Sequence, residues 1–385
     1  MDLQSRSGNA PAVGDEVELL IGPVAHGGHW VARWDGRVVF VRHALTGERA
    51  LVRVTAVTAR HLFGDAIAVL EAAPDRVPAP CPIVADCGGC DFQHVRPVHQ
   101  RELKRRVVAE QLSRLAGLEW TGVVEPVEPV LGWRTRVRYH ATGAEWGMHP
   151  HRSAAVTPLP EQGCRLAAPG LERPPHPPRP GETQVLGVAA ADGVRWSAVG
   201  DEHLIRERAD GHEHAVLAGG FWQVHPRAAD TLVDAVLEGL RPRAGERALD
   251  LYCGVGLFAG ALARRGVRVT GVEGDRAAVG LARRNVPRAR FHAGAVDGVL
   301  ARLPEARVDL VVLDPPRSGA GPRVMDAVLR RRPRAVAYVA CDPAALARDL
   351  GRARAAGWRL VSLRAFDLFG MTHHVECVAV LEEGR

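Results

Sequence analysis

The chain contains almost no lysine. Lys104 is the only one in 385 residues, so arginine supplies the other 49 of the 50 basic side chains. With 41 glycines and 27 prolines, this bias is typical of a GC-rich genome, and the arginine content is therefore no evidence for RNA binding. The formal charge of +6 permits a nucleic-acid partner without establishing one.

Long apolar runs and a disulfide framework are absent as well. No stretch of about 18 apolar residues occurs, which argues against a transmembrane helix. The first residues, Met1 to Ser5, lack the basic and then apolar order of a signal peptide. Seven cysteines, an odd number, do not suit a secreted disulfide-stabilised domain. We expect a cytoplasmic protein of two or three domains, without a membrane partner.

Short strands separated by turn residues fill the region from residue 13 to residue 70. Asp35-Gly36 between two apolar runs is a strong hairpin signal. Five strands within about 60 residues predict a small closed barrel of the OB type, a frequent platform for single-stranded nucleic acid. A structural module without a ligand fits the pattern equally well. The predicted strands are Glu16–Ile21, Trp30–Arg33, Val38–Val41, Ala50–Val57 and Ala66–Leu70.

A group of cysteines follows the barrel. Cys81, Cys87 and Cys90 form a C-x5-C-x2-C pattern, and Cys164 lies far along the chain. Four such thiols can bind either Zn²⁺ or an iron–sulfur cluster, and their spacing does not separate the two. Three clustered cysteines without a ligand are unusual in a cytosolic chain, so we expect a metal centre here.

The central region mixes helical and strand patterns. Apolar residues at helical spacing predict an amphipathic helix from Arg101 to Leu118, with a basic face that can meet phosphates or solvent. Strand-like patterning returns over residues 123–156, and the proline-rich residues 169–180 are interpreted as a surface spacer. His212 and His214 have the spacing of metal ligands, but with no third ligand nearby we expect both at the surface.

From Phe221 onward strands and helices alternate, which predicts a mostly parallel sheet. A strand ending at Asp250 leads into a glycine loop with Gly254 and Gly256, where backbone can approach a cofactor. The next strand ends in Glu273, about 20 residues on, a position suited to ribose hydroxyls. The third glycine of the dinucleotide fingerprint is missing, which favours a methyltransferase over the competing Rossmann dehydrogenase.

Three later strand ends carry chemically useful side chains. The strand at residues 308–313 leads into Asp314-Pro-Pro-Arg317, which leaves Asp314 at the rim of the sheet. Arg317 can grip a carbonyl or phosphate but cannot stack as an aromatic residue does, which disfavours an adenine N6 target. A second strand ends at Cys341, directly before a helix start that favours the thiolate. Glu376 lies inside the last apolar strand, where an unused charge is costly.

Five motifs occur in the order of one family: Q-V-H-P, D-L-Y-C-G-V-G-L-F, L-D-P-P-R, Y-V-A-C-D-P and T-H-H-V-E. They resemble the S-adenosylmethionine-dependent RNA 5-methyluridine methyltransferases of the TrmA, RlmD and RlmC type. The run G-G-H-W-V-A-R-W-D-G-R-V-V-F-V resembles the TRAM domain, and C-G-G-C-D-F-Q-H resembles the [4Fe-4S] site of bacterial members. The resemblance covers almost the whole chain.

The resemblance implies a three-part architecture. Residues 10–72 form a TRAM-like OB barrel that binds RNA, and residues 73–215 form a central α+β domain with the four-cysteine cluster. The helix at 100–118 is expected to pack on the catalytic domain. Residues 216–385 form a Rossmann-like α/β methyltransferase domain. We expect a monomer whose RNA partner is ribosomal rather than transfer RNA, because the classical transfer-RNA enzyme lacks both cluster and barrel.

The resemblance also implies roles for individual residues. Cys341 is the nucleophile that adds to uracil C6, Glu376 is the base that removes the C5 proton, and Asp314 with Arg317 orients or polarises the uracil. The base must be splayed out of the RNA to reach this pocket. The residues implied for S-adenosylmethionine are Gln223, Asp250, Tyr252, Gly254, Gly256, Glu273, Asp297 and Asp314. Those implied for a [4Fe-4S] cluster, in preference to zinc, are Cys81, Cys87, Cys90 and Cys164.

The sequence departs from the family at three places. Asp342 replaces the usual Asn after the nucleophile, Leu257 stands where ribosomal enzymes often carry Asn, and His29-Trp30 replaces small residues. A cytosine-C5 RNA methyltransferase is a competing interpretation, but such enzymes carry Pro where this chain has Ala340. A non-enzymatic iron–sulfur RNA-binding module is another. The same chemistry on uridine 54 of transfer RNA is a third alternative.

Overall fold

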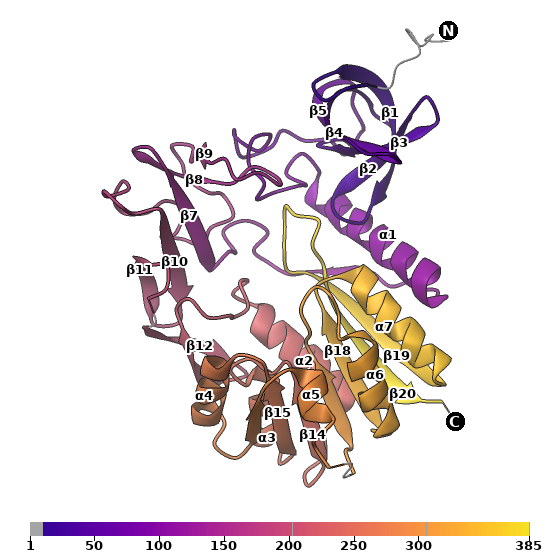
Figure 1. Ribbon diagram of the computed structural model, residues 1–385, viewed down its shortest axis with the longest axis vertical. Coiled ribbons are helices and arrows are strands. Elements are labelled where there is room, and N and C mark those ends of the chain that lie inside the picture. Colours follow the sequence, from indigo (N-terminus) through magenta and orange to yellow (C-terminus); the bar gives the residue numbers. More distant parts are fainter. Residues whose placement is uncertain (1–10, 202, 305–306, 385) are drawn as a thin grey trace.

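The computed structural model describes residues 11–201, 203–304 and 307–384. A barrel lies at one end of the molecule, a large α/β sheet lies at the other, and a mostly antiparallel region flanks both (Figure 1). Residues 10 and 385, where we expected the first domain to begin and the last to end, lie outside the described residues. The domain boundaries near 72 and 215 remain predictions.

The five predicted strands form a closed barrel in the order β1-β2-β3-β5-β4, which β1 and β4 complete by pairing. Leu19 and Ile21 on β1 point into the interior, as the two-residue period of a strand requires. The predicted OB-type barrel is therefore confirmed. Its strands are β1 (Glu16–Ala25), β2 (His29–Trp34), β3 (Arg37–Arg42), β4 (Arg49–Val57) and β5 (His61–Glu71).

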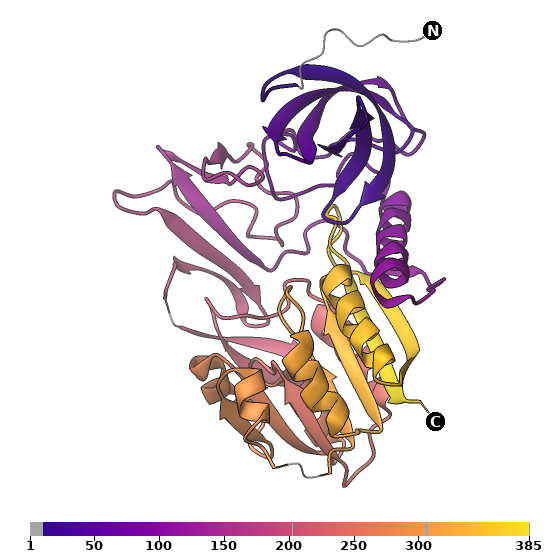
Figure 2. The same ribbon diagram turned by 45° about the vertical axis from the view of Figure 1, so that its right-hand side comes forward.

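The predicted helix is present as α1 (Pro97–Ala116). It begins four residues earlier than Arg101 because Pro97 is well suited to the first turn, and it ends before Gly117, which adopts the left-handed conformation. Leu103 packs into the barrel core, whereas Leu112 packs into the core of the α/β domain. The helix thus connects barrel and catalytic sheet and runs beside α7 (Figure 2).

The central region contains a five-stranded sheet in the order β11-β10-β7-β8-β9 and a separate hairpin, β12-β13. One strand of this region, β6 (Val124–Pro126), instead extends the catalytic sheet by pairing in parallel with β19. The central strands are β7 (Arg136–Thr142), β8 (Glu145–Met148), β9 (Thr157–Pro158), β10 (Gln184–Ala190), β11 (Gly193–Ala198), β12 (Leu204–Ala209) and β13 (His212–Leu217).

The catalytic sheet has the order β16-β15-β14-β17-β18-β20-β19-β6. Strands β14 to β18 are parallel, and β20 is antiparallel to both of its neighbours. Its strands are β14 (Arg247–Leu251), β15 (Arg268–Glu273), β16 (Arg290–Ala293), β17 (Leu310–Leu313), β18 (Ala335–Ala340), β19 (Trp358–Asp367) and β20 (Glu376–Glu383).

Helices cover both faces of this sheet, as two separate apolar cores show. One core contains α2 (Ala228–Leu240), α3 (Leu257–Arg264) and α4 (Arg276–Asn285). The other contains α1, α5 (Val296–Leu300), α6 (Gly321–Arg330) and α7 (Pro343–Ala355). The predicted Rossmann-like methyltransferase fold is confirmed. No helix within the described residues is long and apolar enough to cross a membrane.

One expectation for the central region is wrong. His212 is exposed, but His214 is buried, because it lies on the inward face of β13 and packs against Trp222 with ring centroids 5.3 Å apart. Burial, together with the charge of Arg264, lowers the pKa of His214 to about 4. At this spacing both histidines lie on the same face of β13, but only His214 is enclosed. Within the described residues the two belong to no group of three candidate metal ligands.

Candidate active site

The predicted catalytic residues lie at one edge of the sheet. Asp314 directly follows β17, Cys341 directly follows β18, and Glu376 opens β20. Because β20 is antiparallel to β18, its beginning lies at the carboxyl end of β18, and the pairing of Ala340 with Cys377 brings Cys341 and Glu376 to the same level. Open α/β sheets bind their ligands at this edge.

The glycine loop follows β14 at the same edge. Gly254 and Gly256 have positive φ angles of 52° and 92°, which let the chain turn sharply into α3. Asp250 is fully buried, and its Oδ2 accepts a hydrogen bond from the Ala259 amide at 2.7 Å. Glu273 accepts a hydrogen bond from the Gly254 amide at 3.0 Å. The two carboxylates therefore shape the loop from the ends of neighbouring strands.

Tyr252 and Asp297, two of the proposed cofactor residues, lie near this loop. Tyr252 is half-buried with a positive φ of 64°, and burial followed by the charges of Asp349, Asp297 and Glu273 raises the pKa of its phenol to about 12. Gln223 is half-buried on the connection from β13 to α2. No hydrogen bond joins the Gln223 side chain to the other candidates within the described part of the chain.

Burial raises the pKa values of three carboxyl groups at the site. It raises the pKa of Glu376 well above the ordinary value, and the neighbouring charge of Asp314 adds to this effect. Burial also raises the pKa values of Asp314 and Asp250 to about 7, with the charge of Glu273 contributing to both. Three closely spaced carboxyl groups of this kind favour a cationic ligand, because a positive charge restores their ionised forms.

The thiol of Cys341 is protonated at rest. Burial, and then the charge of Glu376, raises its pKa to about 12, although Arg317 acts in the opposite direction. The expectation that the start of α7 favours the thiolate is therefore wrong for the resting protein: burial and nearby carboxylates outweigh the helix N-terminus.

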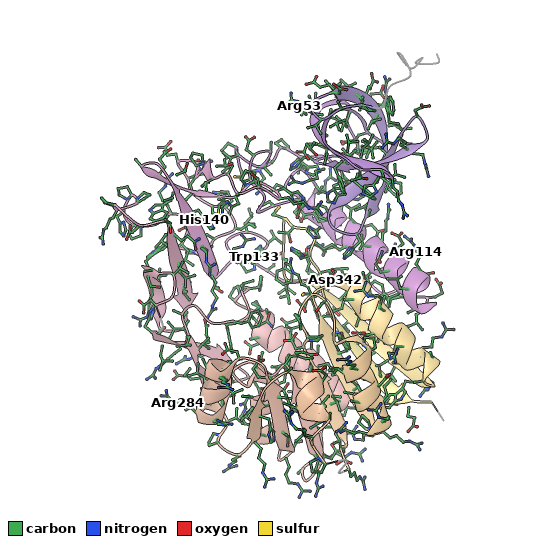
Figure 3. All side chains as sticks on the ribbon, viewed as in Figure 1. Arg53, Arg114, Trp133, His140, Arg284 and Asp342 are labelled. Carbon is green, nitrogen blue, oxygen red and sulfur yellow. The ribbon has the colours of Figure 1, made fainter. Side chains whose placement is uncertain are left out.

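The carboxylate of Asp342 has two partners. Its Oδ1 accepts a hydrogen bond from the Ala345 amide at 2.7 Å and so caps α7, and its Oδ2 lies 3.0 Å from Nε2 of His26 in the barrel. Burial alone would raise the pKa of Asp342, but the hydrogen bonds from His26 and Ala345 hold it below its usual value. Figure 3 shows Asp342 between the barrel and the catalytic sheet.

A chain of polar contacts runs from Arg317 towards the cysteine group. Nη2 of Arg317 lies 3.2 Å from Nε2 of His374, the His374 and His373 rings are 4.1 Å apart, and Nδ1 of His373 lies 2.6 Å from Oδ2 of Asp91. Asp91 is buried and directly follows Cys90. Burial would raise the pKa of Asp91, but His373 holds it at about 2. The segment that carries Cys81, Cys87 and Cys90, called the cysteine loop below, is thus in direct contact with the active-site edge.

The four predicted metal-binding cysteines line a single cavity. Cys81 and Cys90 are buried, Cys87 and Cys164 are half-buried, and all four are free thiols. Arg134 and Arg165 line the same cavity, and the Gly89 amide lies 3.4 Å from the sulfur of Cys87. Among the described residues, no three His, Cys, Asp or Glu side chains are arranged to hold a single metal ion.

Two contacts at the site were not found from the sequence, that of His26 with Asp342 and that of Asp91 with His373. His26 and Asp342 are 316 positions apart, so no local pattern connects them. Asp91 and His373 each lie inside a motif that was noted, C-G-G-C-D and T-H-H-V-E, but nothing in the sequence shows that these motifs meet. In these two motifs the sequence analysis assigned functions only to the cysteines and to Glu376.

Fold and site together define a class of protein. A two-sided Rossmann-like sheet with a glycine loop after β14 and an acid after β15 is a methyltransferase that uses S-adenosylmethionine, here joined to an OB-type barrel. Three family models match: the TRAM domain at residues 12–67, the methyltransferase small domain at 227–335 and tRNA (Uracil-5-)-methyltransferase at 295–384.

The whole chain also has relatives of similar length. An uncharacterized RNA methyltransferase of Streptomyces avermitilis is 49% identical, with 96% of this chain and 99% of the relative covered. The 23S rRNA (uracil(1939)-C(5))-methyltransferases RlmD of Thiobacillus denitrificans and Pseudomonas putida are 32% and 33% identical, over 93% and 97% of this chain and 97% and 95% of theirs. The chain belongs to this family of RNA uracil-C5 methyltransferases.

A solved structure has the same fold over nearly the whole chain. The crystal structure of Pyrococcus abyssi tRNA (uracil-54, C5)-methyltransferase with S-adenosyl-L-homocysteine aligns with a TM-score of 0.71 and 23% identity, covering 95% of this chain and 100% of that one. At this identity the likeness establishes the fold alone.

Proposed function

We propose that this protein transfers a methyl group from S-adenosylmethionine to C5 of a uridine in 23S rRNA, through a covalent bond between Cys341 and uracil C6. The observation that carries the proposal is the proximity of Cys341 and Glu376, which follows from the pairing of Ala340 with Cys377 across β18 and β20 at the edge of a methyltransferase sheet that also carries the glycine loop. The two RlmD relatives, whose names give this reaction on 23S rRNA, support the choice of RNA.

The proposed reaction explains why a thiol and a carboxylate must be neighbours. Uracil C5 is a weak nucleophile, but a Cys341 thiolate that adds to C6 pushes electrons onto C5 as an enolate. Bound S-adenosylmethionine supplies an electrophilic methyl group, which C5 accepts as the sulfonium bond breaks. Glu376 then takes the proton from C5, and the sulfur of Cys341 leaves C6 as the ring double bond re-forms.

Asp314 and Arg317 are assigned to the uracil and the donor. Arg317 is exposed and lines the same pocket as Cys341, so its guanidinium can bind a uracil carbonyl or the phosphate of a splayed-out nucleotide. The charge of Asp314 raises the pKa of Glu376, and the charge of Glu273 raises the pKa of Asp314, so the Asp314 carboxyl lies close to both. A carboxylate in this position can interact with S-adenosylmethionine, the methyl donor, and with the uracil, the methyl acceptor.

The residues proposed to bind S-adenosylmethionine divide by location. Asp250, Gly254 and Gly256 form the loop that lets backbone approach the donor, and Glu273 is placed for ribose hydroxyls. Tyr252 and Asp297 lie on the side of the loop towards α5, and Gln223 precedes α2. Mutation of Asp250 is expected to act through the shape of the loop, because its carboxylate is fully buried.

The four cysteines fit a [4Fe-4S] cluster. They supply four sulfur ligands around one cavity, and two arginines beside them can balance the negative charge of a thiolate-bound cluster. Their arrangement around a cavity, rather than around a point, favours a cluster over a single zinc ion. Cys81, Cys87, Cys90 and Cys164 would hold the cluster, and Asp91 would connect its loop to the active-site edge.

The barrel is proposed to bind the RNA around the target base. Phe40 and Phe63 on adjacent strands β3 and β5 are half-buried and stacked, with ring centroids 5.5 Å apart. The guanidinium of Arg152 lies 5.4 Å from the Phe63 ring. Aromatic rings next to a cation are a platform for unstacked bases. We propose that a monomer acts in this way in the cytoplasm.

A direct product assay tests the proposal. Purified protein is mixed with S-adenosylmethionine carrying a labelled methyl group and with equal amounts of unmodified 23S rRNA and transfer RNA. Digestion to nucleosides and mass spectrometry should find 5-methyluridine in the 23S rRNA only. Label in transfer RNA would move the target to that RNA, and label on cytosine or adenine would overturn the assignment.

A further inference from the structure

The pocket at Cys341 is built by two parts of the chain. Cys341 and Arg317 line it from the catalytic sheet, whereas Ala25, His26, Gly27 and Gly28 line it from the turn between β1 and β2 of the barrel. A barrel whose only role was to hold RNA at a distance would not need to reach the reactive thiol. This turn, residues 25–28, is called the barrel turn below.

The barrel turn contacts the loop that carries Cys341. His26 lies 3.0 Å from Oδ2 of Asp342, the residue directly after Cys341. The other oxygen of Asp342 caps α7 through the Ala345 amide. Both carboxylate oxygens are thus occupied, one by the catalytic domain and one by the barrel, and the backbone next to the thiol is fixed from two sides.

The same turn also contacts the loop that leads to Glu376. Gly28 has a φ of 77°, and a Cβ atom placed on it would lie 2.9 Å from Nδ1 of His373. The turn therefore packs directly on the segment between β19 and β20, whose last residue precedes Glu376. One short barrel segment touches the supports of both groups that the reaction needs.

We infer that the barrel turn forms one wall of the uridine pocket, and that His26 is a positioning residue that acts on Cys341 through Asp342. The inference rests on the proposed function and adds a role to the barrel, which contributes to the chemical step as well as to RNA binding. Asp342 then has two tasks. Its Oδ1 caps α7, and its Oδ2 contacts His26 of the barrel turn.

The test separates chemistry from binding. Single-turnover methylation is measured at saturating RNA and S-adenosylmethionine, and the RNA dissociation constant is measured separately, for His26→Ala, His26→Gln and Asp342→Ala. Loss of one hydrogen bond to a carboxylate is expected to slow His26→Ala by about tenfold. Its dissociation constant for RNA should remain within about twofold of that of the unchanged protein, because the lost contact does not contribute to RNA binding. His26→Gln should recover most of the rate, because its amide can donate to Asp342.

A double variant and a control complete the design. Because His26 acts through Asp342, His26→Ala/Asp342→Ala should be no slower than Asp342→Ala alone. His212→Ala, which removes an exposed histidine from β13, should leave the rate unchanged. Gly28→Ala, which forces a Cβ against His373, should slow the single-turnover step as His26→Ala does.

The outcomes distinguish this inference from the proposed function. If the unchanged protein makes no 5-methyluridine, the proposed function fails. If it is active but His26→Ala is equally fast, or weakens only RNA binding, the positioning role is overturned. Equal slowing by His26→Ala with and without Asp342 would overturn the path through Asp342.

Discussion

Cys341 and Glu376 must each lose a proton before the proposed reaction can run. In the resting protein the pKa of Cys341 is raised to about 12 and that of Glu376 lies well above its usual value. A positive charge placed beside them lowers both pKa values. S-adenosylmethionine carries such a charge on its sulfonium. We therefore expect the donor to bind before the uracil is attacked.

Donor affinity should depend on pH through Asp314. Its pKa is raised to about 7, so the carboxyl is neutral below pH 7 and becomes a negative partner for the sulfonium above it. The dissociation constant of S-adenosylmethionine should fall from pH 6 to pH 8 by up to about tenfold, as a charge interaction of ordinary strength implies. S-adenosylhomocysteine, which lacks the sulfonium charge, should show a smaller change.

Calorimetric titrations at both pH values check this, with Asp314→Asn as the matched variant. That variant should show a smaller pH dependence for S-adenosylmethionine than the unchanged protein, and the remainder is assigned to Asp250, whose pKa is also raised to about 7. Equal pH dependence for the two ligands in the unchanged protein would show that Asp314 does not face the sulfonium.

Replacing the base should trap the reaction after methyl transfer. In Glu376→Gln the thiol can still add and C5 can still accept the methyl, but no group removes the C5 proton. Turnover should fall by roughly 10² to 10⁴-fold, the usual contribution of a general base. An RNA–protein adduct that survives denaturing electrophoresis should accumulate on ordinary RNA.

Glu383→Gln, at the far end of the same strand, provides the control and should release its product normally. If Glu376→Gln turns over slowly without any adduct, another group takes the proton and Glu376 serves only the shape of the site.

At the scale of elements, α1 is held to the catalytic domain by a buried ion pair. Nζ of Lys104 lies 2.6 Å from Oδ1 of Asp367 and 3.0 Å from the Phe369 carbonyl, and both charged side chains are almost fully enclosed. Burial lowers the pKa of Lys104, and the charge of Asp367 opposes this. The only lysine of the chain is thus a structural residue, not part of a phosphate-binding surface.

Lys104→Met should therefore destabilise the protein strongly. It leaves Asp367 buried without its cation, which costs about 3–5 kcal/mol in comparable buried pairs. Arg105→Met breaks a more exposed pair with Glu102 on the same helix and should cost less than about 1 kcal/mol. Denaturant unfolding measures both. Similar stabilities for the two variants would contradict the structural role of Lys104.

The cysteine loop gives a second prediction at this scale, which concerns its metal content. Protein purified without oxygen should contain about four iron and four sulfide per chain, as a [4Fe-4S] cluster requires. Cys87→Ser removes one ligand and should lose most of the iron, whereas Cys377→Ala, in the core of the catalytic sheet, should keep it. Metal and sulfide analysis decides the matter, and zinc without sulfide would identify a zinc site.

The sequence predicted local elements well and contacts between elements poorly. Alternating apolar residues and Asp35-Gly36 are local signals, and they predicted all five barrel strands. Strand ends at Asp314 and Cys341 were also local, so the active-site edge could be predicted. The pair of His26 and Asp342 joins segments 316 positions apart, and no periodicity reports such a contact.

Burial was the other property that local patterns misjudged. His214 and Lys104 both look like surface residues in the sequence, yet both are buried by segments from elsewhere in the chain. The protonated state of Cys341 has the same origin. A helix start predicts a reactive thiolate, but burial opposes it, followed by the charges of Glu376 on β20, of Asp314 after β17 and of the adjacent Asp342. The sequence shows where the helix begins, but it does not show which strands lie beside that helix start.

At the scale of the whole molecule, barrel, cysteine loop and catalytic sheet meet at one place. The barrel turn contacts Asp342, and Asp91 of the cysteine loop contacts His373, so each part touches a loop that leads to a proposed catalytic residue. An RNA held on the barrel and a base inserted at Cys341 would therefore be bound by parts of the chain that contact one another.

The most direct test of the central claim is a covalent trap. The protein is mixed with S-adenosylmethionine and RNA that contains 5-fluorouridine, whose fluorine cannot leave as a proton. The account predicts a denaturation-resistant adduct on 23S rRNA that is absent in Cys341→Ala. An adduct that persists in Cys341→Ala, or no adduct from folded protein that binds the donor, would contradict it.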